Sequence, residues 1–360
     1  MAIHTHALHA AHDAHDLAGE AHALGNLGVV YTRQGYYPQA AEHYQQALAL
    51  FREIGDRVGE AHVLGNLGVA YTRQGYYPQA AEHYQQALAL FREIGDRVGE
   101  VRALGNLGVA YTRQGHYGQA VEHHQQALAL CREVGDRVSE ANALGNLGLV
   151  YWRQGHYGQA VEHHQQALAL FCEIGDRSGE AYVLGNLGLV HQRQGYYQQA
   201  AEHHQQALAL FREIGDRGGE AHALDNLGLV HQRQGYYQQA AEHHQQALAL
   251  FREIGDRGGE AEALNGVGET HHATGHHDHA HAHHTAALTL ATQISDRYEQ
   301  ARAHNGLAHT HHATGDPDQA RHHWRQALTL YTDLGVPEAD DVHAHLATVD
   351  PAADGSDGND

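Results

Sequence analysis

Eight histidines lie within fourteen residues, between positions 271 and 284 of the chain. Within this stretch His277 precedes His281 by four residues, and His279 precedes His283 by the same interval. On a helix that spacing places two imidazoles on one face, as a pair of zinc or nickel ligands requires. The pattern therefore makes His277, His279, His281 and His283 candidate metal ligands.

A structural role for the same histidines competes with metal binding. His271, His277 and His284 fall at positions that tyrosine holds in earlier copies of a sequence repeat, where an aromatic side chain is expected to face the core. No cysteine lies in the stretch, and acidic neighbours are few. We therefore assign no physiological metal site and expect only weak, adventitious metal binding.

The composition argues against catalysis. All 22 basic residues are arginine, so a phosphate-binding loop that ends in lysine and a Schiff-base lysine are both excluded. An active site needs a unique, asymmetric set of groups, whereas most polar residues here recur several times. No serine nucleophile motif is present. We expect a protein that is not an enzyme and has no cofactor.

The charge and hydropathy of the chain limit its partners. The formal charge of −21 argues against direct nucleic-acid binding, which needs clustered positive charge. Full protonation of the 38 histidines would change it to +17, so the histidines are either drifted arginine and tyrosine positions or a pH sensor. No long apolar run and no apolar leader is present, so we expect no membrane insertion and a cytoplasmic protein.

A forty-residue period organises the sequence. The block Leu24–Gly28 recurs almost unchanged and marks eight copies, with starts near 21, 61, 101, 141, 181, 221, 261 and 301. We predict an elongated repeat array over 21–334. Residues 1–20 align with the end of a preceding copy, so they are either a cap or a sign that the chain is a piece of a longer protein. Residues 335–350 are expected to form a capping helix, and 351–360 a disordered tail.

Each repeat reads as two antiparallel helices. Apolar residues at spacings of three and four run from Ala21 to Tyr31, and glycine at position 35 ends this first helix. A second apolar face runs from Tyr37 to Phe51 and ends before Gly55. Because each hairpin buries its apolar faces only against the next one, the sequence predicts an all-α fold.

The repeat resembles the tetratricopeptide repeat, extended from about 34 residues to forty. The positions that carry the resemblance are Leu24, Asn26, Leu27, Gly28, Tyr31, Gly35, Tyr37, Ala40, Tyr44 and Ala47. It implies a right-handed superhelical solenoid whose first helices line a concave groove. The stretches 296–303 and 334–340 also resemble repeats at the C-terminal end of bacterial antibiotic-regulatory (SARP-type) and NB-ARC regulators.

The resemblance implies which residues line the groove. A variable row includes Asn142 and Tyr182, an apolar row includes Val109, Leu149 and Leu189, and a third row of threonines has Trp152 in the fourth repeat. An arginine row runs beside them, with one member in each of the first six repeats: Arg33, Arg73, Arg113, Arg153, Arg193 and Arg233.

Two interpretations of the arginine row stay open. Guanidinium groups spaced one per repeat suit a ligand that carries carboxylates, because arginine makes planar, bidentate contacts. Alternatively, each arginine pairs with a nearby carboxylate such as Glu20, Glu60 or Asp56. The asparagine with which many family members hold a peptide backbone is replaced by Val29 and its equivalents, so docking is expected to rely on apolar and arginine contacts.

A glycine recurs inside the first helix, at Gly25, Gly65, Gly105, Gly145 and Gly185. Glycine inside a helix costs about 1 kcal/mol relative to alanine. Close approach of a partner or simple copying of one repeat could each explain it.

We predict a non-catalytic scaffold or sensor that binds a protein or peptide, with acidic segments favoured, in the groove. The alternatives are the detached sensor region of a bacterial transcriptional regulator and a histidine-rich metal- or pH-responsive protein. The sequence does not predict the oligomeric state.

Overall fold

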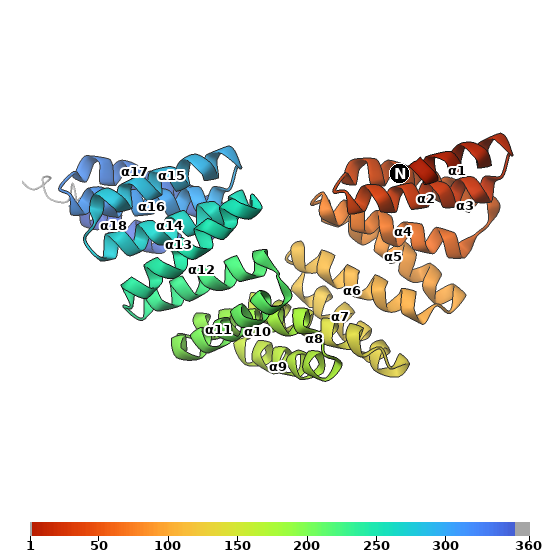
Figure 1. Ribbon diagram of the computed structural model, residues 1–360, viewed down its shortest axis with the longest axis horizontal. Coiled ribbons are helices and arrows are strands. Elements are labelled where there is room, and N and C mark those ends of the chain that lie inside the picture. Colours follow the sequence, from red (N-terminus) through yellow and green to blue (C-terminus); the bar gives the residue numbers. More distant parts are fainter. Residues whose placement is uncertain (1, 350–360) are drawn as a thin grey trace, which may run out of the picture. The chain divides into compact units, whose positions relative to one another are not determined.

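The computed structural model describes residues 2–349, with side chains from residue 4 onward. All regular secondary structure in this part of the chain is helical (Figure 1). The predicted tail at 351–360 lies outside the described residues. The all-α prediction is confirmed.

The repeats alternate a seventeen-residue first helix with a second helix of seventeen or eighteen residues. The first helices are α2 (Leu17–Arg33), α4 (Arg57–Arg73), α6 (Arg97–Arg113), α8 (Arg137–Arg153), α10 (Arg177–Arg193), α12 (Arg217–Arg233), α14 (Arg257–Ala273) and α16 (Arg297–Ala313). The second helices are α3 (Tyr37–Ile54), α5 (Tyr77–Ile94), α7 (Tyr117–Val134), α9 (Tyr157–Ile174), α11 (Tyr197–Ile214), α13 (Tyr237–Ile254), α15 (His277–Gln293) and α17 (Pro317–Leu334). Two further helices are α1 (Ala2–Asp13) and α18 (Glu338–Val349).

Each first helix begins at an aspartate cap. The Asp56 carboxylate accepts a hydrogen bond from the backbone N–H of Gly59, and Asp96 does the same for Gly99, both at 2.9 Å. Such a bond satisfies one of the free N–H groups at a helix start. Because of this cap, α4 begins at Arg57, a few residues before the repeat start that we placed near 61.

The hairpins close on small residues. A Cβ on Gly28 would lie 2.5 Å from the Tyr44 ring, so only glycine lets α2 and α3 pack this closely. The second helix then ends at Gly55, whose φ of 73° is the left-handed conformation that glycine adopts without strain. Alanines such as Ala21 and Ala40 fill the rest of the interface with no exposed surface.

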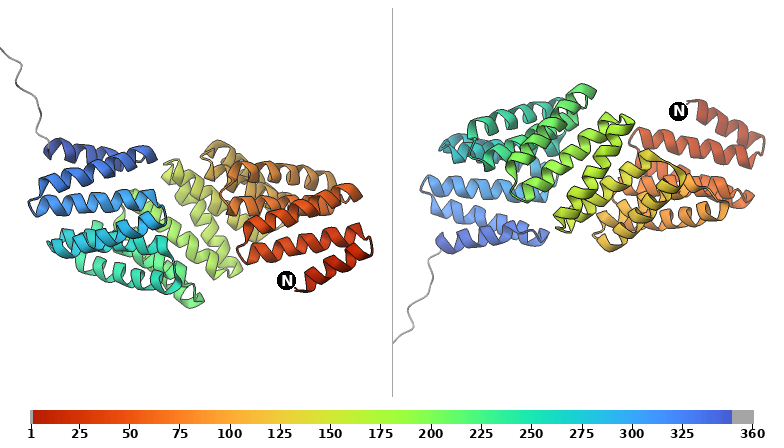
Figure 2. Two further views of the ribbon diagram at one scale, coloured as in Figure 1. Left: turned by 90° about the horizontal axis from the view of Figure 1, so that it is seen from above. Right: turned by 90° about the horizontal axis from the view of Figure 1, so that it is seen from below.

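The chain forms two compact units, Met1–Gly179 and Glu180–Asp360. In the first unit, each helix from α1 to α9 packs on the next, and the first helices α2, α4, α6 and α8 also contact one another in order (Figures 1 and 2). In the second unit, α11 to α18 pack in the same way, with α12, α14 and α16 in contact. Each unit thus has one layer of first helices and one of second helices.

Candidate functional site

Each first helix keeps one narrow stripe in contact with solvent. In α2 this stripe runs through His22, Asn26, Val29 and Arg33, spaced four, three and four residues apart on one helical face. His22, Asn26 and Arg33 are exposed, and Val29 is half-buried. We call this stripe, with its equivalents at intervals of forty residues, the first-helix face.

Most of the predicted groove residues lie on the first-helix face. Asn142 and Tyr182 are exposed, and Val109, Leu149 and Leu189 are half-buried. The arginine row is exposed in every repeat that has it, at Arg33, Arg73, Arg113, Arg153, Arg193 and Arg233. Cations, a polar row and an apolar row therefore share one accessible surface within each unit.

The row arginines do not pair with the carboxylates that could have neutralised them. Glu60 is held instead by Arg52 and Arg57, at 2.8 and 2.9 Å. Asp56 caps α4, and Glu20 lies 3.6 Å from Nδ1 of His12.

The same arrangement recurs in the next repeat, where Arg92 and Arg97 hold Glu100. In the part of the chain that the structure describes, no ion pair or hydrogen bond engages a row arginine. The one contact found is a stacking contact, in which the Arg153 guanidinium lies 5.2 Å from the centre of the Trp152 ring.

The threonine row does not belong to the first-helix face. The Thr72 hydroxyl donates to the carbonyl of Gly68 and lies 3.2 Å from the Tyr84 hydroxyl on the second helix of the same hairpin. Trp152 occupies this row, is half-buried, and has its indole N–H enclosed. The placement of Trp152 among the groove residues stays a prediction.

The glycine row borders open space. A Cβ on Gly65, Gly105 or Gly185 would meet no atom within 4 Å, and one on Gly25 would only touch Val63 at 3.8 Å. Packing inside the protein therefore gives no reason for glycine here. The row leaves the middle of the first-helix face without side chains.

The face changes character in the last repeats. Glu269 takes the place of the apolar row, and the Arg302 guanidinium binds it with two hydrogen bonds, at 2.6 and 3.0 Å. Arg302 also lies 3.6 Å from Glu299. Arg302 stands at the repeat position of Asn142 and Tyr182, but its side chain is only 15% exposed and its guanidinium is bound within the protein.

Two glutamates of this cluster differ sharply in acidity. Although burial raises the pKa of Glu269, the adjacent Arg302 outweighs it and holds the pKa at about 2. Burial, with the charges of Asp225 and Glu299, raises the pKa of Glu262 to about 8. The sequence signals this cluster by two glutamates. Glu262 stands where earlier repeats have neutral or basic residues, and Glu269 stands where they have apolar ones.

Buried polar side chains surround Arg302 and the two glutamates. The Asn265 amide donates to the Glu299 carboxylate at 2.8 Å, and its other side-chain atom lies 3.0 Å from His284 Nδ1. In the preceding repeat Asp225 takes the same role and lies 2.7 Å from His244 Nδ1. Asp225 and Asn265 replace the open glycine row and fill it with buried polar contacts.

The histidine-rich stretch is spread over several directions. His277 packs near His272 and His281 near His311, while His279 and His283 both contact His271. Among residues 2–349 no group of three or more histidine, cysteine or acidic side chains is arranged to hold a metal ion. The i, i+4 pairs are present, but the fold adds no third ligand.

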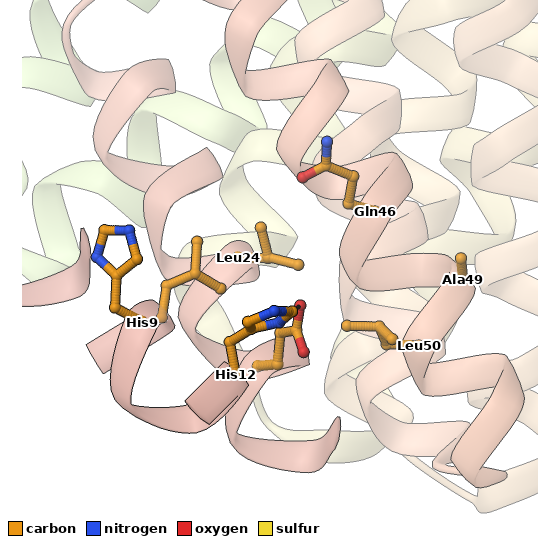
Figure 3. A pocket seen from close by; sticks show the side chains of 8 residues that line it. His9, His12, Leu24, Gln46, Ala49 and Leu50 are labelled. Atoms are coloured by element: carbon orange, nitrogen blue, oxygen red, sulfur yellow. Dashed lines mark ion pairs between the residues drawn. The ribbon is translucent and has the colours of Figure 1, made fainter. Parts of the chain in front are cut away.

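A pocket that the sequence did not predict opens at the N-terminal end of the first unit. It has a volume of about 430 Å³ and lies between α1, α2 and α3. Figure 3 shows its lining, with His9 and His12 from α1, Leu24 from α2, and Gln46 and Leu50 from α3.

Comparisons with known proteins agree with this architecture. Comparison with curated proteins finds no match. Among solved structures, the apo form of RapI has a TM-score of 0.63 at 18% identity and covers 77% of this chain and 99% of its own. A Rap protein complexed with Competence and Sporulation Factor has a TM-score of 0.57 at 15% identity and covers 92% of this chain and 98% of its own.

A third similar structure is a STAND protein (Signal Transduction ATPase with Numerous Domains) with a tetratricopeptide repeat sensor, from Pyrococcus horikoshii. It has a TM-score of 0.67 at 16% identity and covers 91% of this chain, which spans half of that protein. At these identities the likeness concerns the fold alone. Separately, no helix in the described part of this chain combines the length and the apolar character needed to cross a membrane.

The family assignment rests on the sequence itself. A family model of the tetratricopeptide repeat matches residues 19–93, 95–173, 179–253, 228–293 and 259–333. The matches span nearly all the repeats, and the hairpins of the structure follow the same period. The chain belongs to the tetratricopeptide repeat family.

Proposed function

We propose that the protein is a protein-interaction module that binds an acidic segment of a partner protein on the first-helix face of repeats 1–4, within the first unit. The observation that carries the proposal is the arginine row. In a chain of net charge −21, these exposed guanidinium groups have no carboxylate partner within the described residues, whereas arginines such as Arg52 and Arg57 are paired. Unpaired arginines favour bidentate contacts with carboxylates from outside.

The rest of the face suits such a ligand. Val109 and Leu149 offer half-buried apolar surface beside the arginines. Between these rows the glycine positions are open, so a peptide backbone or a helix can approach closely. Apolar contact would supply most of the affinity, and the arginines would select acidic sequences.

The similar structures are consistent with this use of the fold. One of them is a Rap protein complexed with Competence and Sporulation Factor, so in that protein the fold accommodates a bound factor. The present proposal extends binding to this chain through its own residues.

The test reverses part of the arginine row. The native chain and a variant with Arg73, Arg113 and Arg153 changed to Glu would be used to capture partners from source lysate after chelator treatment. The interacting segment would then be synthesised and its Kd measured against both proteins. We expect an acidic segment, bound roughly a hundredfold more weakly by the variant, since each lost contact contributes about 1 kcal/mol. Equal affinity for both proteins would refute the proposal.

A matched control separates the site from general charge repulsion. In repeats 1–6 the glutamine at the third position of the second helix is exposed, and changing all six to Glu also lowers the net charge by six: Gln39, Gln79, Gln119, Gln159, Gln199 and Gln239. Acidic residues in a first helical turn are favourable, so this control should fold. It should bind the segment within a few-fold of the native chain.

The sensor region of a larger regulator is a second candidate function. The STAND protein with a tetratricopeptide repeat sensor matches 91% of this chain, while the chain spans only half of that protein. In this case the captured partner would be an NTPase or DNA-binding domain. A partner of any other class, bound through the arginine row, would favour the independent interaction module.

A further inference from the structure

Five repeats bury a histidine at the centre of their hairpin. We call these residues the histidine column: His124, His164, His204, His244 and His284, each at most 1% exposed. Each ring lies directly against a glycine of its own first helix. A Cβ on Gly108, for example, would lie 2.5 Å from the His124 ring. The column therefore holds the two helices of each hairpin together.

Repeats 1 and 2 have tyrosine at the same position. Tyr44 and Tyr84 are equally buried, and their hydroxyls lie 3.3 and 3.2 Å from the hydroxyls of Thr32 and Thr72. These rings are neutral at any ordinary pH, and burial raises the pKa of Tyr84 to about 12. Their polar atoms are satisfied inside the hairpin.

His124, His164 and His204 lack such partners. Neither ring nitrogen of His124 or His204 has a hydrogen-bond partner among the described residues, nor does Nδ1 of His164. In repeat 3 the Thr112 hydroxyl donates to the Gly108 carbonyl at 2.8 Å, as Thr72 does to Gly68, but among the described residues no hydrogen bond joins it to the His124 ring. A protonated imidazole in these sites would bury a positive charge without an acceptor, which is strongly unfavourable.

The charged groups around these rings offer no compensation. Burial lowers the pKa of His124 and His164 to about 4 and that of His204 to about 3. The neighbouring imidazoles on the same second helices, His123 and His163 among them, lower these pKa values further. On the first helix each of these three rings lies against a glycine, and no carboxylate is among the charges that act on their pKa values.

The last two members of the column differ. His244 has the Asp225 carboxylate at Nδ1, and Glu269 also faces it from α14. His284 lies against Asn265, Glu269, His272 and His283, with Arg302 opposing its protonation from α16. These two rings therefore lie beside charged side chains and are not part of the inference below.

We propose that His124, His164 and His204 make repeats 3–5 an acid-sensitive segment, whose hairpins open in mildly acidic solution while those of repeats 1 and 2 stay closed. Opening is the response of the free protein, so this inference does not depend on the proposed binding function. It gives the array a built-in means of dismantling part of the first-helix face when the pH falls.

The sign and size of the effect follow from proton linkage. A histidine whose folded pKa lies below its unfolded value stabilises the hairpin fully above about pH 6.5 and loses that contribution as the pH falls. For His124, with a folded pKa of about 4, the opening equilibrium should rise about tenfold at pH 5.5 and about thirtyfold at pH 5.0.

The experiment measures hydrogen exchange of α7 and α5 in the free native chain between pH 7.5 and 5.0, corrected for intrinsic exchange. The first variant is His124→Tyr, which places beside Thr112 the ring that repeat 2 has beside Thr72. We expect α7 to lose most of its acid-induced opening in this variant. Equal opening of α7 in native and variant chains at pH 5.0 would overturn the proposal.

The reciprocal variant and a surface control complete the test. Tyr84→His should make α5 clearly more acid-sensitive than in the native chain, where His83 on this helix already has a pKa lowered by burial, and failure to do so would also contradict the proposal. The control is His116→Tyr, an exposed position where Tyr36 and Tyr76 stand in repeats 1 and 2. It makes the same chemical change in repeat 3 and should leave the opening of α7 as acid-sensitive as in the native chain.

Discussion

The first-helix face of repeats 1–4 and that of repeats 7–8 are built on the same helices but treat charge in opposite ways. In the first unit Arg73 and Arg113 are exposed and unpaired within the described chain, and the glycine row is open. In the last repeats Arg302 is bound to Glu269, and Asn265 fills the glycine row. The repeat fold thus fixes where a side chain points, whereas the neighbouring side chains decide whether it stays free to bind a ligand.

We expect the largest effect on stability from replacing Arg302, compared with the equivalent Arg102, by alanine. Arg302 and Arg102 are equivalent residues, separated by five repeats, but only Arg302 is engaged by carboxylates. Arg302→Ala should destabilise α16 by about 3 kcal/mol, because Glu269 and Glu299 lose their counter-charge. Arg102→Ala should change stability by less than about 0.5 kcal/mol. Hydrogen exchange of α16 and α6 measures both, and similar losses in the two helices would remove the contrast.

The glycine row provides a second pair of equivalent positions. Asn265→Ala should destabilise α14 by about 2 kcal/mol, since the Glu299 carboxylate and His284 each lose a buried hydrogen-bond partner. Gly105→Ala places a methyl group in open space and should stabilise α6 by up to about 1 kcal/mol. Opposite signs in thermal unfolding and hydrogen exchange support the comparison. A loss of stability in both variants would show that the face of the first unit is packed after all.

The smallest effect concerns the pH dependence of the acidic cluster. Burial and nearby carboxylates raise the pKa of Glu262 to about 8, so its ionisation destabilises the folded state as the pH rises from about 4.5 towards 8. Glu262→Gln should therefore stabilise α14 by about 1 kcal/mol at pH 8, a value reduced for its partial exposure, and by less at pH 5. If Glu262→Gln stabilised α14 equally at pH 8 and at pH 5, the effect would come from packing and not from ionisation.

Much of the fold could be predicted from the sequence because the determinants are local. The aspartate caps, the glycines at 35 and 55 and the spacing of Leu24, Leu27 and Tyr31 act within one hairpin. Repetition then shows the same signal eight times. Exposure of the arginine row was also within reach, since Arg33 lies on the face opposite to Leu27 and Gly28.

The partners of polar side chains could not be predicted in the same way. Glu60 could have paired with a row arginine, but it is held by Arg57, one turn away on the same helix, and by Arg52, whose approach from α3 depends on how the helices pack. The contact of the Thr72 hydroxyl with Tyr84 on the second helix was likewise not visible in the sequence. The replacement of Tyr84 by His124 was visible in the sequence, but that neither imidazole nitrogen has a hydrogen-bond partner depends on how the two helices pack.

The ion pairs between second and first helices bear on how the array can change in length. Glu100 is held by Arg92, eight residues before it, and Arg137 reaches Glu173, thirty-six residues after it. If residues 97–136 were excised, Asp96 would join Arg137, Arg92 would meet Glu140, and Arg137 would keep Glu173. Both intervals are unchanged by the loss of one full period. Unequal recombination between copies of the gene segment can therefore add or remove whole repeats while every junction keeps its partners, so related chains of different length should remain foldable.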